Sequence, residues 1–482
     1  MSSIVGLQGN VKANDIIKML KTSKNRGPDS SGVYLDGIHT DIDLDEFSDD
    51  GNYGIAFGHN LLSVYDSEDR YSKPQPVSND NLTLVFNGSL YNFPTIKNLL
   101  SKVGVEKQIT DDAEALLYLI DFYNRGDLVN AIRSATRLID GDYAFAVWDG
   151  ENIALVRDPL GVKPLFYGEN DSLKGFASTK EALKAVGFTD INTLKPEHIL
   201  YNWEDISPAQ PIFEKVFEGD VAKIDKMLKL SVAKRVGGLS EIGVIFSGGL
   251  DSSYIALLLK EISENIPLKI KLYAVGAEGS KDVEAAKYAS KFLNIDLEIC
   301  EVTEESVREV LPQLVKAIGD DNLMKVGVGL TTYFATKMVA EDGIKVAFSG
   351  QGADELFGGY KRYVQAFIDG TLNYELRNDM SNMYHVNLER DDACSMLNSV
   401  ELRLPFLDKT LVELVLNIPD NKKIVSMHDD MRKSILRKLA FEEGLDYEIA
   451  YRPKKAAQYG TGIDKILRKK IIKDTDLSQF LE

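Results

Sequence analysis

The stretch VIFSGGLDSSYIAL (244–257) determines how the second half of the chain folds. Its apolar residues up to Phe246 predict a buried strand, and the run after the glycines predicts a helix. Between them, Ser247, Gly248 and Gly249 form a turn in which the glycines let backbone N–H groups approach a ligand. Because a helix N-terminus carries a partial positive charge, this strand–turn–helix unit predicts a phosphate-binding loop.

The aspartate that follows these glycines, Asp251, is unusual for a phosphate-binding loop. The loop has no lysine, so it differs from the G-x-x-x-x-G-K-[ST] loop of many nucleotide-binding proteins. A carboxylate is repelled by phosphate unless a divalent cation lies between them, and Mg²⁺ commonly binds one or two carboxylates together with phosphate oxygens. Taken alone, this stretch fits equally well an Asp251 and a Ser252 that merely cap the helix.

A second stretch, IKVAFSGQGADELFGGY (344–360), repeats the arrangement. It again places Ser-Gly directly after an apolar strand, and Asp354 follows. Ligands bind at the carboxyl ends of parallel strands, so Asp251 and Asp354 would face one cation if the two strands are neighbours. The paired loops therefore favour metal binding over helix capping.

The regions around these loops differ in their patterns. After about residue 220, apolar strands alternate with helices, which predicts a parallel sheet covered on both faces, and the remainder to Glu482 is predicted to be mainly helical. The first two hundred residues contain short β-type runs, with helical patterns near 13–21 and 112–123, and predict stacked sheets with helices outside. A proline-containing stretch separates the two regions. The predicted domains are 1–205 and 219–482, joined by a linker at 206–218.

Composition limits the classes of partner and compartment. A length of 482 residues predicts two or three domains. The net charge of −18 argues against a nucleic-acid partner, because affinity for phosphate backbones comes from clustered Lys and Arg. The two cysteines, Cys300 and Cys394, are predicted to be buried thiols. No apolar stretch approaches the ~20 residues that span a membrane, and no signal peptide is recognisable, so we expect a cytoplasmic protein without membrane association.

Several motifs resemble one family, in the same order along the chain. One set resembles the synthetase domain of the asparagine synthetase B family: SGGLDSS (247–253), SGQGADELFGGY (349–360), ELRLPFLD (401–408) and RPKKA (452–456). Another set resembles the glutamine-hydrolysing domain of that family: RGPDSSG (26–32), GHNLLS (58–63), FNGSLYN (86–92), TDDAEALL (110–117) and RDPLGVKPLFYG (157–168).

The resemblance implies a fold and an activity. The N-terminal domain would be an α+β, four-layer αββα fold of the N-terminal-nucleophile glutaminase type. The C-terminal domain would be an α/β parallel-sheet ATP-pyrophosphatase domain, similar to the adenine nucleotide alpha hydrolases, with a mainly helical end. Such an enzyme uses ATP and Mg²⁺ to adenylate a small-molecule carboxylate, aspartate in the family, and then forms an amide with ammonia. The resemblance is compatible with a homodimer.

The resemblance also implies roles for individual residues. Asp251 and Asp354 would bind Mg²⁺, and together with Lys454, which would stabilise developing charge, they form the expected catalytic set. Arg403 is interpreted as structural. The residues expected to contact the nucleotide are Phe246 and Val275 at the adenine, Ser247, Gly248, Gly249 and Ser252 at the pyrophosphate, and Ser349 and Gly350.

Three departures from the family pattern fall in the glutamine site. The family has a nucleophilic cysteine at position 2, where this chain has Ser2, and a serine hydroxyl needs stronger activation than a thiol. Leu61 replaces an arginine that would bind the carboxylate of glutamine, and Ser89 replaces a glutamate that would bind its amino group. We therefore predict that glutaminase activity is lost. The retained members of the site are Asn87, Gly88 and Asp112.

A fourth departure is Gln351, which replaces a glutamate in the synthetase motif and cannot accept a proton as a base. It leaves open a different carboxylate substrate, such as the one that a β-lactam synthetase cyclises. Another alternative is that the chain is not an enzyme but a non-catalytic, regulatory homologue. The intact pair of aspartate loops in the predicted synthetase domain argues against this alternative. A tRNA-modifying pyrophosphate-loop enzyme is disfavoured by the net charge.

Overall fold

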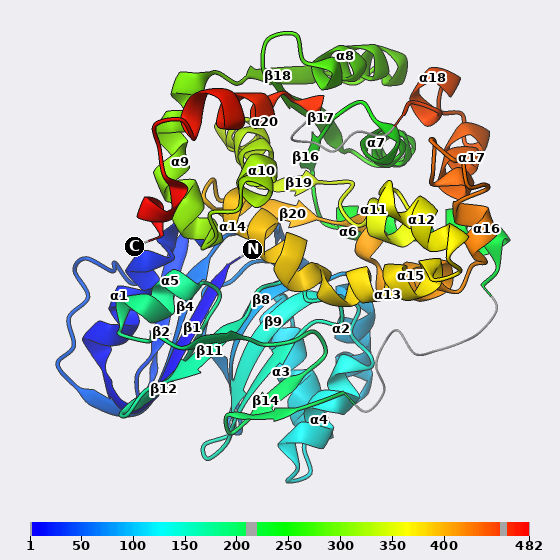
Figure 1. The fold of residues 1–482 in the computed structure, drawn as a ribbon. Coiled ribbons are helices and arrows are strands. Elements are labelled where there is room, and N and C mark those ends of the chain that lie inside the picture. Colours follow the sequence, from blue (N-terminus) through cyan, green and yellow to red (C-terminus); the bar gives the residue numbers. More distant parts are fainter. Residues whose placement is uncertain (1, 209–218, 454–459, 482) are drawn as a thin grey trace. The chain divides into compact units, whose positions relative to one another are not determined.

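A computed structural model describes residues 2–208, 219–453 and 460–481. In it the chain divides into two units, Met1–Gln210 and Pro211–Glu482 (Figure 1).

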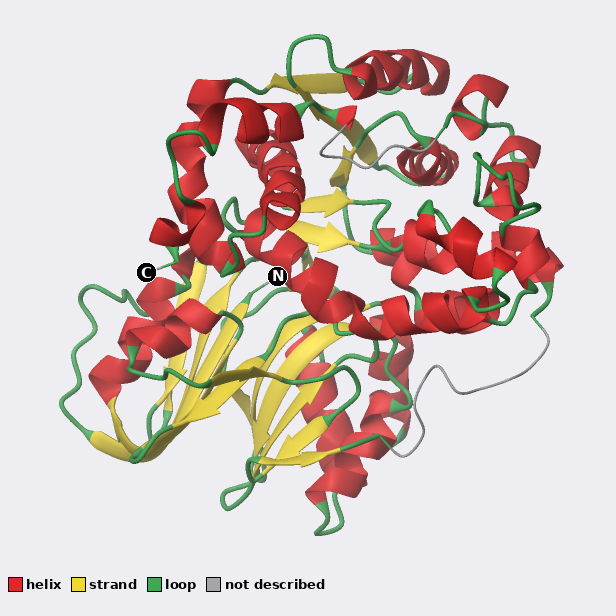
Figure 2. Cartoon of the chain, viewed as in Figure 1, coloured by secondary structure: helices red, strands yellow, loops and turns green. Residues whose placement is uncertain are grey.

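The first unit contains two antiparallel sheets, drawn as yellow arrows in Figure 2. In spatial order the larger sheet consists of β13 (Ile191–Thr193), β11 (Phe166–Glu169), β12 (Leu173–Ala177), β1 (Ser3–Lys12), β4 (Asn52–Leu61), β2 (Ser30–Tyr34) and β3 (Ile38–Thr40). The other consists of β15 (Glu204–Ile206), β14 (Ile199–Tyr201), β10 (Ile153–Arg157), β9 (Gly141–Trp148), β8 (Thr83–Leu90) and β7 (Val77–Ser78). A small hairpin joins β5 (Asp66–Ser67) and β6 (Arg70–Tyr71).

Helices cover the outer face of each sheet. On the larger sheet lie α1 (Ala13–Thr22) and α5 (Lys180–Ala185). On the other lie α2 (Phe93–Lys102), α3 (Asp112–Tyr123) and α4 (Leu128–Thr136). Short turns of helix include Lys24–Arg26. The helical patterns predicted near 13–21 and 112–123 are therefore confirmed.

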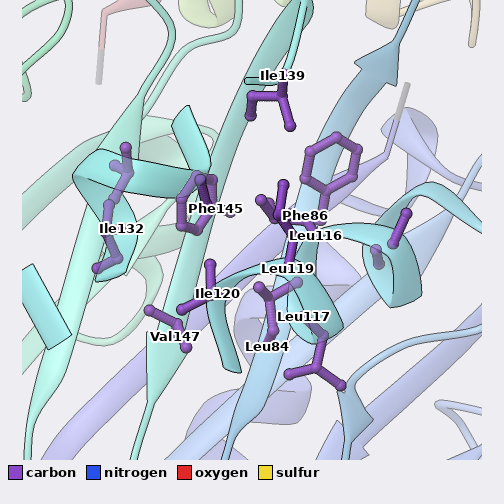
Figure 3. Close-up of a cluster of buried hydrophobic side chains, with 14 of the residues drawn as sticks. Leu84, Phe86, Leu116, Leu117, Leu119, Ile120, Ile132, Ile139, Phe145 and Val147 are labelled. Carbon is purple, nitrogen blue, oxygen red and sulfur yellow. The ribbon is translucent and has the colours of Figure 1, made fainter. Parts of the chain in front are cut away.

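Strand alternation explains the layers, because successive side chains of a strand point to opposite faces of its sheet. In β1, Ile4 belongs to the apolar cluster shared by the two sheets, whereas Val5 belongs to the cluster beneath α1. In β8, Val85 joins the inter-sheet cluster and Phe86 faces the helices. Figure 3 shows this helix-side cluster. The predicted four-layer αββα fold is confirmed.

The second unit is built on a five-stranded parallel sheet, as predicted. Its spatial order is β18 (Leu297–Glu301), β17 (Lys269–Gly276), β16 (Glu241–Ile245), β19 (Val346–Phe348) and β20 (Glu401–Arg403). The longer helices are α6 (Ile224–Val236), α7 (Leu250–Ser263), α8 (Lys281–Leu293), α9 (Glu304–Ile318), α10 (Leu323–Glu341), α13 (Leu372–Met383), α14 (Glu389–Met396), α15 (Lys409–Leu416) and α17 (Ser434–Glu442).

The rest of this unit is mainly helical, which agrees with the sequence pattern apart from β20. The shorter α-helices are α11 (Ala353–Phe357), α12 (Arg362–Ile368), α16 (Asp420–Lys423), α18 (Tyr447–Ala450) and α20 (Ile463–Ile466). Other short helical turns span Val221–Lys223, Tyr384–Leu388, Pro405–Leu407, Leu467–Ile471 and Leu477–Phe480.

The cysteines differ in burial. Cys394 in α14 is buried, but Cys300 is only partly buried, so the prediction of two buried thiols is wrong for Cys300. The reason is its position in β18, at the edge of the sheet. Across the described residues, no helix combines the length and apolarity that crossing a membrane requires.

Candidate active site

The first loop of the site connects β16 to α7 and depends on one glycine. Gly248 has φ +64°, in the left-handed region that favours glycine. A Cβ at this position would lie 2.4 Å from backbone atoms of Ala285 and Ala286 in α8. The turn therefore brings its backbone directly against the neighbouring helix, which only a glycine allows.

Hydrogen bonds to two serine hydroxyl groups fix the conformation of this loop at the start of α7. The N–H of Ser247 donates to Oγ of Ser252 over 3.3 Å, and the N–H of Gly249 donates to Oγ of Ser247 over 3.3 Å. Gly249 is the N-cap of α7 and supplies no capping side chain. Because neither Asp251 nor Ser252 is the N-cap residue, the interpretation of these two residues as simple caps is wrong. The helix N-terminus instead faces the loop, which suits an anion.

The second loop follows β19, which is a direct parallel neighbour of β16. The N–H of Ser349 donates to the carbonyl of Arg403 over 3.0 Å, which continues the sheet into the loop. A Cβ on Gly350 would lie 2.9 Å from Cβ of Asp251. The two loops thus meet where the sequence pattern placed the two aspartates.

The carboxylates of Asp251 and Asp354 converge on one cation, the ammonium of Lys433. Lys433 Nζ lies 2.7 Å from Oδ2 and 2.8 Å from Oδ1 of Asp251. The same atom lies 2.6 Å from Oδ1 of Asp354. The lysine side chain is 1% exposed and the two carboxylates are 14% and 15% exposed. The position between the aspartates therefore attracts positive charge.

This geometry fits a divalent cation. Two carboxylates already point at one positive atom, and Mg²⁺ in nucleotide sites binds one or two carboxylates and takes its other ligands from water and phosphate. Among the described residues, no group of three or more His, Cys, Asp or Glu side chains is arranged to hold a metal without such help. Asp251 and Asp354 would be the protein ligands.

The buried side chain of Glu355, the residue after Asp354, stabilises the second loop. Glu355 accepts hydrogen bonds at Oε1 from the hydroxyl of Tyr360 over 2.6 Å and from Nδ2 of Asn387 over 2.8 Å. Burial, and then the neighbouring charge of Asp354, raises the pKa of the Glu355 carboxyl. These bonds fix the short helix that carries Asp354.

The remaining residues expected at the nucleotide lie around the two loops. Phe246 and Val275 are buried at the ends of β16 and β17. The N–H of Gln351 donates to Oγ of Ser349 over 3.3 Å. Lys454 lies outside the described residues. Two residues earlier, Arg452 donates through Nη1 to the carbonyl of Ser247 over 3.1 Å.

The structure assigns Arg403 a structural position. Its side chain is fully buried, and its Nε lies 3.0 Å from Oε1 of Glu401. Its Nη1 also donates to the backbone carbonyl of Arg235 in α6. The interpretation of Arg403 as structural agrees with these contacts.

The first unit brings together the expected members of the glutamine site. The N–H of Ser2 donates to Oδ1 of Asn87 over 3.0 Å, and the N–H of Leu62 donates to Oγ of Ser2 over 3.4 Å. Nδ2 of Asn87 is buried and has no hydrogen-bond partner among the described residues. Such an orphan donor beside Gly88 is suited to a developing oxyanion.

An arginine closes this site. Arg70 pairs with Asp112, with Nη2 2.6 Å from Oδ2 and Nε 3.0 Å from Oδ1. The guanidinium also lies 3.7 Å from the centre of the Tyr65 ring. The cavity lined by Ser2, Leu61 and these side chains has a volume of about 30 Å³. That is the space of roughly one or two water molecules.

Sequence reasoning missed Lys433 and Arg70. Lys433 is 182 residues from Asp251 along the chain and lies in a polar stretch that resembles a solvated loop. Arg70 lies in a charged hairpin with similar character. Both stretches show only a charged residue in a turn, which is the usual pattern of a solvent-exposed loop.

Comparison with known proteins agrees with this geometry. A family model described as asparagine synthase matches residues 223–373 and 368–475, and one described as glutamine amidotransferase domain matches residues 1–229. A protein of Methanocaldococcus jannaschii named "putative asparagine synthetase (glutamine-hydrolyzing) 1" is 36% identical, over 97% of this chain and 94% of its own length. The glutamine-hydrolysing asparagine synthetase of Rattus norvegicus is 28% identical, over 88% of this chain and 80% of its own length.

These matches span both units and cover both aspartate loops. Their order along the chain is the order of the two folds described above. The chain therefore belongs to the asparagine synthase family, and is an ATP-dependent carbon–nitrogen ligase.

Proposed function

We propose that this chain adenylates aspartate with Mg·ATP and then converts the acyl-adenylate to asparagine with free ammonia. The observation that carries the proposal is the convergence of Asp251 and Asp354 on one cationic position beside an open helix N-terminus. Phosphate, metal and carboxylates can meet there without a P-loop lysine.

The proposed reaction has two steps, adenylation of the carboxylate and formation of the amide. An oxygen of the aspartate side-chain carboxylate attacks the α-phosphorus of ATP, the bond between the α-phosphorus and the bridging oxygen breaks, and pyrophosphate leaves. Ammonia then attacks the acyl carbon, the acyl C–O bond breaks, AMP leaves with that oxygen, and the nitrogen loses a proton to solvent or a base. Bound Mg²⁺ would neutralise phosphate charge.

Residues of the chain would bind and orient in these steps. The backbone N–H groups around Gly248 and Gly249 would bind the pyrophosphate portion of ATP. Phe246 and Val275 would flank the adenine, and Ser349 and Gly350 would line the nucleotide. Lys454 would stabilise negative charge at the reacting centre.

Glutamine would not supply the nitrogen. Ser2 replaces the nucleophilic thiol, and Arg70 already pairs with Asp112 in a cavity of about 30 Å³. Free glutamine has ten non-hydrogen atoms and does not fit a space of this size, so the cavity would have to open before glutamine could bind. The relatives above carry glutamine-hydrolysing names, and the proposal for this chain differs from those names in this respect.

A second candidate, another carboxylate substrate, is favoured by one observation. Gln351 stands where the family has a glutamate, and its amide cannot act as a base. A substrate with its own free amine, as in an intramolecular ring closure, would need that base less. A panel of carboxylates therefore distinguishes the two candidates.

The test is release of pyrophosphate and AMP from ATP, Mg²⁺ and each carboxylate, with ammonium or glutamine as nitrogen source. Asparagine formed with aspartate and ammonium, and not with glutamine, would support the proposal. Asp251→Ala should abolish turnover, whereas Asp369→Ala, at an exposed aspartate of the same unit, should not. No pyrophosphate with any carboxylate would overturn both candidates.

A further inference from the structure

The backbone that carries Lys433 is strained. Arg432 and Lys433 have φ values of +54° and +52°, so two consecutive residues other than glycine adopt the left-handed conformation. This conformation is unfavourable for residues with a side chain, and it persists only where surrounding contacts impose it. Those contacts therefore indicate what the segment is held in place to do.

One carboxylate organises the segment from its N-terminal side. Oδ1 of Asp429 accepts the N–H groups of Met431 and Arg432, over 3.0 and 2.7 Å. Its Oδ2 accepts the N–H of Val425 over 3.0 Å. Nε of Arg432 then donates to the carbonyl of Gly359 over 2.8 Å, which ties the segment to the second aspartate loop.

A buried arginine holds the same segment through its carbonyls. Arg437 donates from Nε to the carbonyl of Arg432 and from Nη2 to that of Met431, each over 2.7 Å. Its Nη1 donates to the carbonyl of Ala450 over 2.7 Å. The amide side and the carbonyl side of the turn are thus both fixed, and Lys433 is aimed at the aspartates by the fold.

The backbone at Gly359 packs closely against Asp354 and the side chain of Lys433. A Cβ at Gly359 would lie 1.9 Å from Oδ1 of Asp354 and 2.3 Å from Cε of Lys433. A buried ammonium is tolerated only when it is paired, and here it meets two carboxylates. These three groups together carry a net charge of −1 when all are ionised.

We propose that Lys433 is the internal counter-ion of the metal site, which a divalent cation displaces on binding. The proposal rests on the proposed Mg·ATP site, and it concerns how the charge of the two aspartates is balanced before the metal binds. Mg²⁺ binds oxygen at 2.0–2.1 Å, so it cannot share the space between Asp251 and Asp354 with an ammonium that contacts both. The flexible four-carbon stem of lysine allows the ammonium to move.

Displacement has an energetic consequence. Without nucleotide, a metal must separate Lys433 from both carboxylates and leave a buried ammonium unpaired, so metal alone binds weakly. With nucleotide, phosphate oxygens give that ammonium a new anionic partner. Metal and nucleotide therefore bind with positive coupling, and the coupling depends on Lys433.

The experiment uses the full chain and Mn²⁺ as the probe, with free Mn²⁺ measured by electron paramagnetic resonance. In the absence of nucleotide, Lys433→Met should bind Mn²⁺ at least about tenfold more tightly than the wild type, because Asp251 and Asp354 then lose the ammonium that contacts both of them. A non-hydrolysable ATP analogue should tighten Mn²⁺ binding at least about tenfold in the wild type and much less in the variant.

Control variants separate this effect from general change in charge. Lys438→Met removes a lysine of α17, the helix that begins directly after Lys433, and should leave Mn²⁺ affinity unchanged, because this side chain is 64% exposed and lies 3.7 Å from Glu442. Asp251→Ala should abolish the tight Mn²⁺ binding that the wild type is expected to show in the presence of the ATP analogue. Equal or weaker Mn²⁺ binding by Lys433→Met would overturn the proposal.

The wild-type measurement keeps the proposal testable even if Lys433→Met fails to fold. Absence of any nucleotide-dependent tightening of Mn²⁺ in the wild type would overturn it. Lys433→Arg keeps a cation in place and should bind Mn²⁺ no more tightly than the wild type; tenfold tighter binding would contradict a counter-ion role. Failure of the ligase proposal is distinguishable, because it would appear as absent pyrophosphate release while the Mn²⁺ differences remain.

Discussion

The guanidinium of Arg70 and the carboxylate of Asp112 form a buried two-point ion pair, with Nη2 2.6 Å from Oδ2 and Nε 3.0 Å from Oδ1. The side chains are 10% and 7% exposed. Asp112 also accepts the N–H of Leu90 at Oδ2 over 2.9 Å. A carboxylate expected to belong to a substrate site is thus engaged in contacts within the chain, which favours a structural role for Asp112.

Removing the arginine should destabilise the first unit. Arg70→Met leaves the Asp112 charge buried without a cation, and we expect a loss of about 3–5 kcal/mol in the free energy of unfolding. Both tryptophans, Trp148 and Trp203, lie in the first unit, so urea unfolding followed by tryptophan fluorescence reports on it.

The matched control for this variant is Lys97→Met. Lys97 lies 3.5 Å from Asp69, whose side chain is 96% exposed, and such surface pairs contribute at most about 1 kcal/mol. An Arg70→Met protein as stable as the Lys97→Met protein would show that the Arg70–Asp112 pair does not hold the pocket closed.

The first unit should lose stability in acid through His59. This histidine is fully buried, both ring nitrogens are without hydrogen-bond partners among the described residues, and burial lowers its pKa from 6.5 to about 3. Below pH 6.5 the unfolded chain therefore binds a proton that the folded chain does not, and stability falls as the pH decreases toward 3. At pH 5 the loss is about 2 kcal/mol.

The measurement compares tryptophan-detected unfolding of the wild type and His59→Leu between pH 7 and pH 5. Leucine cannot take up a proton, so the free energy of unfolding of the His59→Leu protein should fall less than that of the wild type over this interval. His39→Leu, at an exposed position in β3, should keep the wild-type pH dependence. An unchanged slope in His59→Leu would rule out His59 as the source.

Much of the architecture follows from local sequence pattern. The parallel sheet was predictable because β16 and β19 are apolar runs that end in Ser-Gly, and their adjacency brings Asp251 and Asp354 together. The strand β20 was not predictable from the sequence, because its charged residues Glu401 and Arg403 are typical of an exposed segment. They are fully buried as an ion pair instead, which only the three-dimensional fold reveals.

The candidate site shows the same limit. Its two aspartates lie at recognisable strand ends, but Lys433 reaches them through a turn set by Asp429 and Arg437, which no local periodicity encodes. Arg70 likewise enters the first-unit pocket from a hairpin. Long polar side chains that act far from their own position in the sequence are therefore the part that pattern reasoning does not reach.

The tight packing at Gly359 gives a third prediction. In Gly359→Ala the new methyl group would overlap Asp354 and Lys433, so we expect at least about a tenfold loss of ligase activity and a stability loss of about 1–3 kcal/mol. Gly237→Ala is the control, because its Cβ would meet only the carbonyl of Lys234 at 3.5 Å, an ordinary contact. Equal activity in the two variants would mean that the site tolerates a shift of the Asp354 carboxylate.

Gln351 gives a fourth prediction. Gln351→Glu introduces a carboxylate that can accept a proton from the attacking nitrogen, so the rate of ammonium-dependent amide formation at pH 7 should rise several-fold. The gain should shrink at pH 9, where more of the ammonia is already unprotonated. Gln479→Glu, an exposed position with the same change of charge, should have no effect. No gain at either pH would argue against a missing base.

The central claim is that the chain activates a carboxylate by adenylation. The most direct measurement incubates the wild type with aspartate labelled with ¹⁸O in its side-chain carboxylate, together with ATP, Mg²⁺ and ammonium, and determines the mass of the nucleotide product. Adenylation predicts AMP that carries one ¹⁸O atom. Formation of ADP with ¹⁸O in inorganic phosphate, or of AMP without the label, would contradict the account.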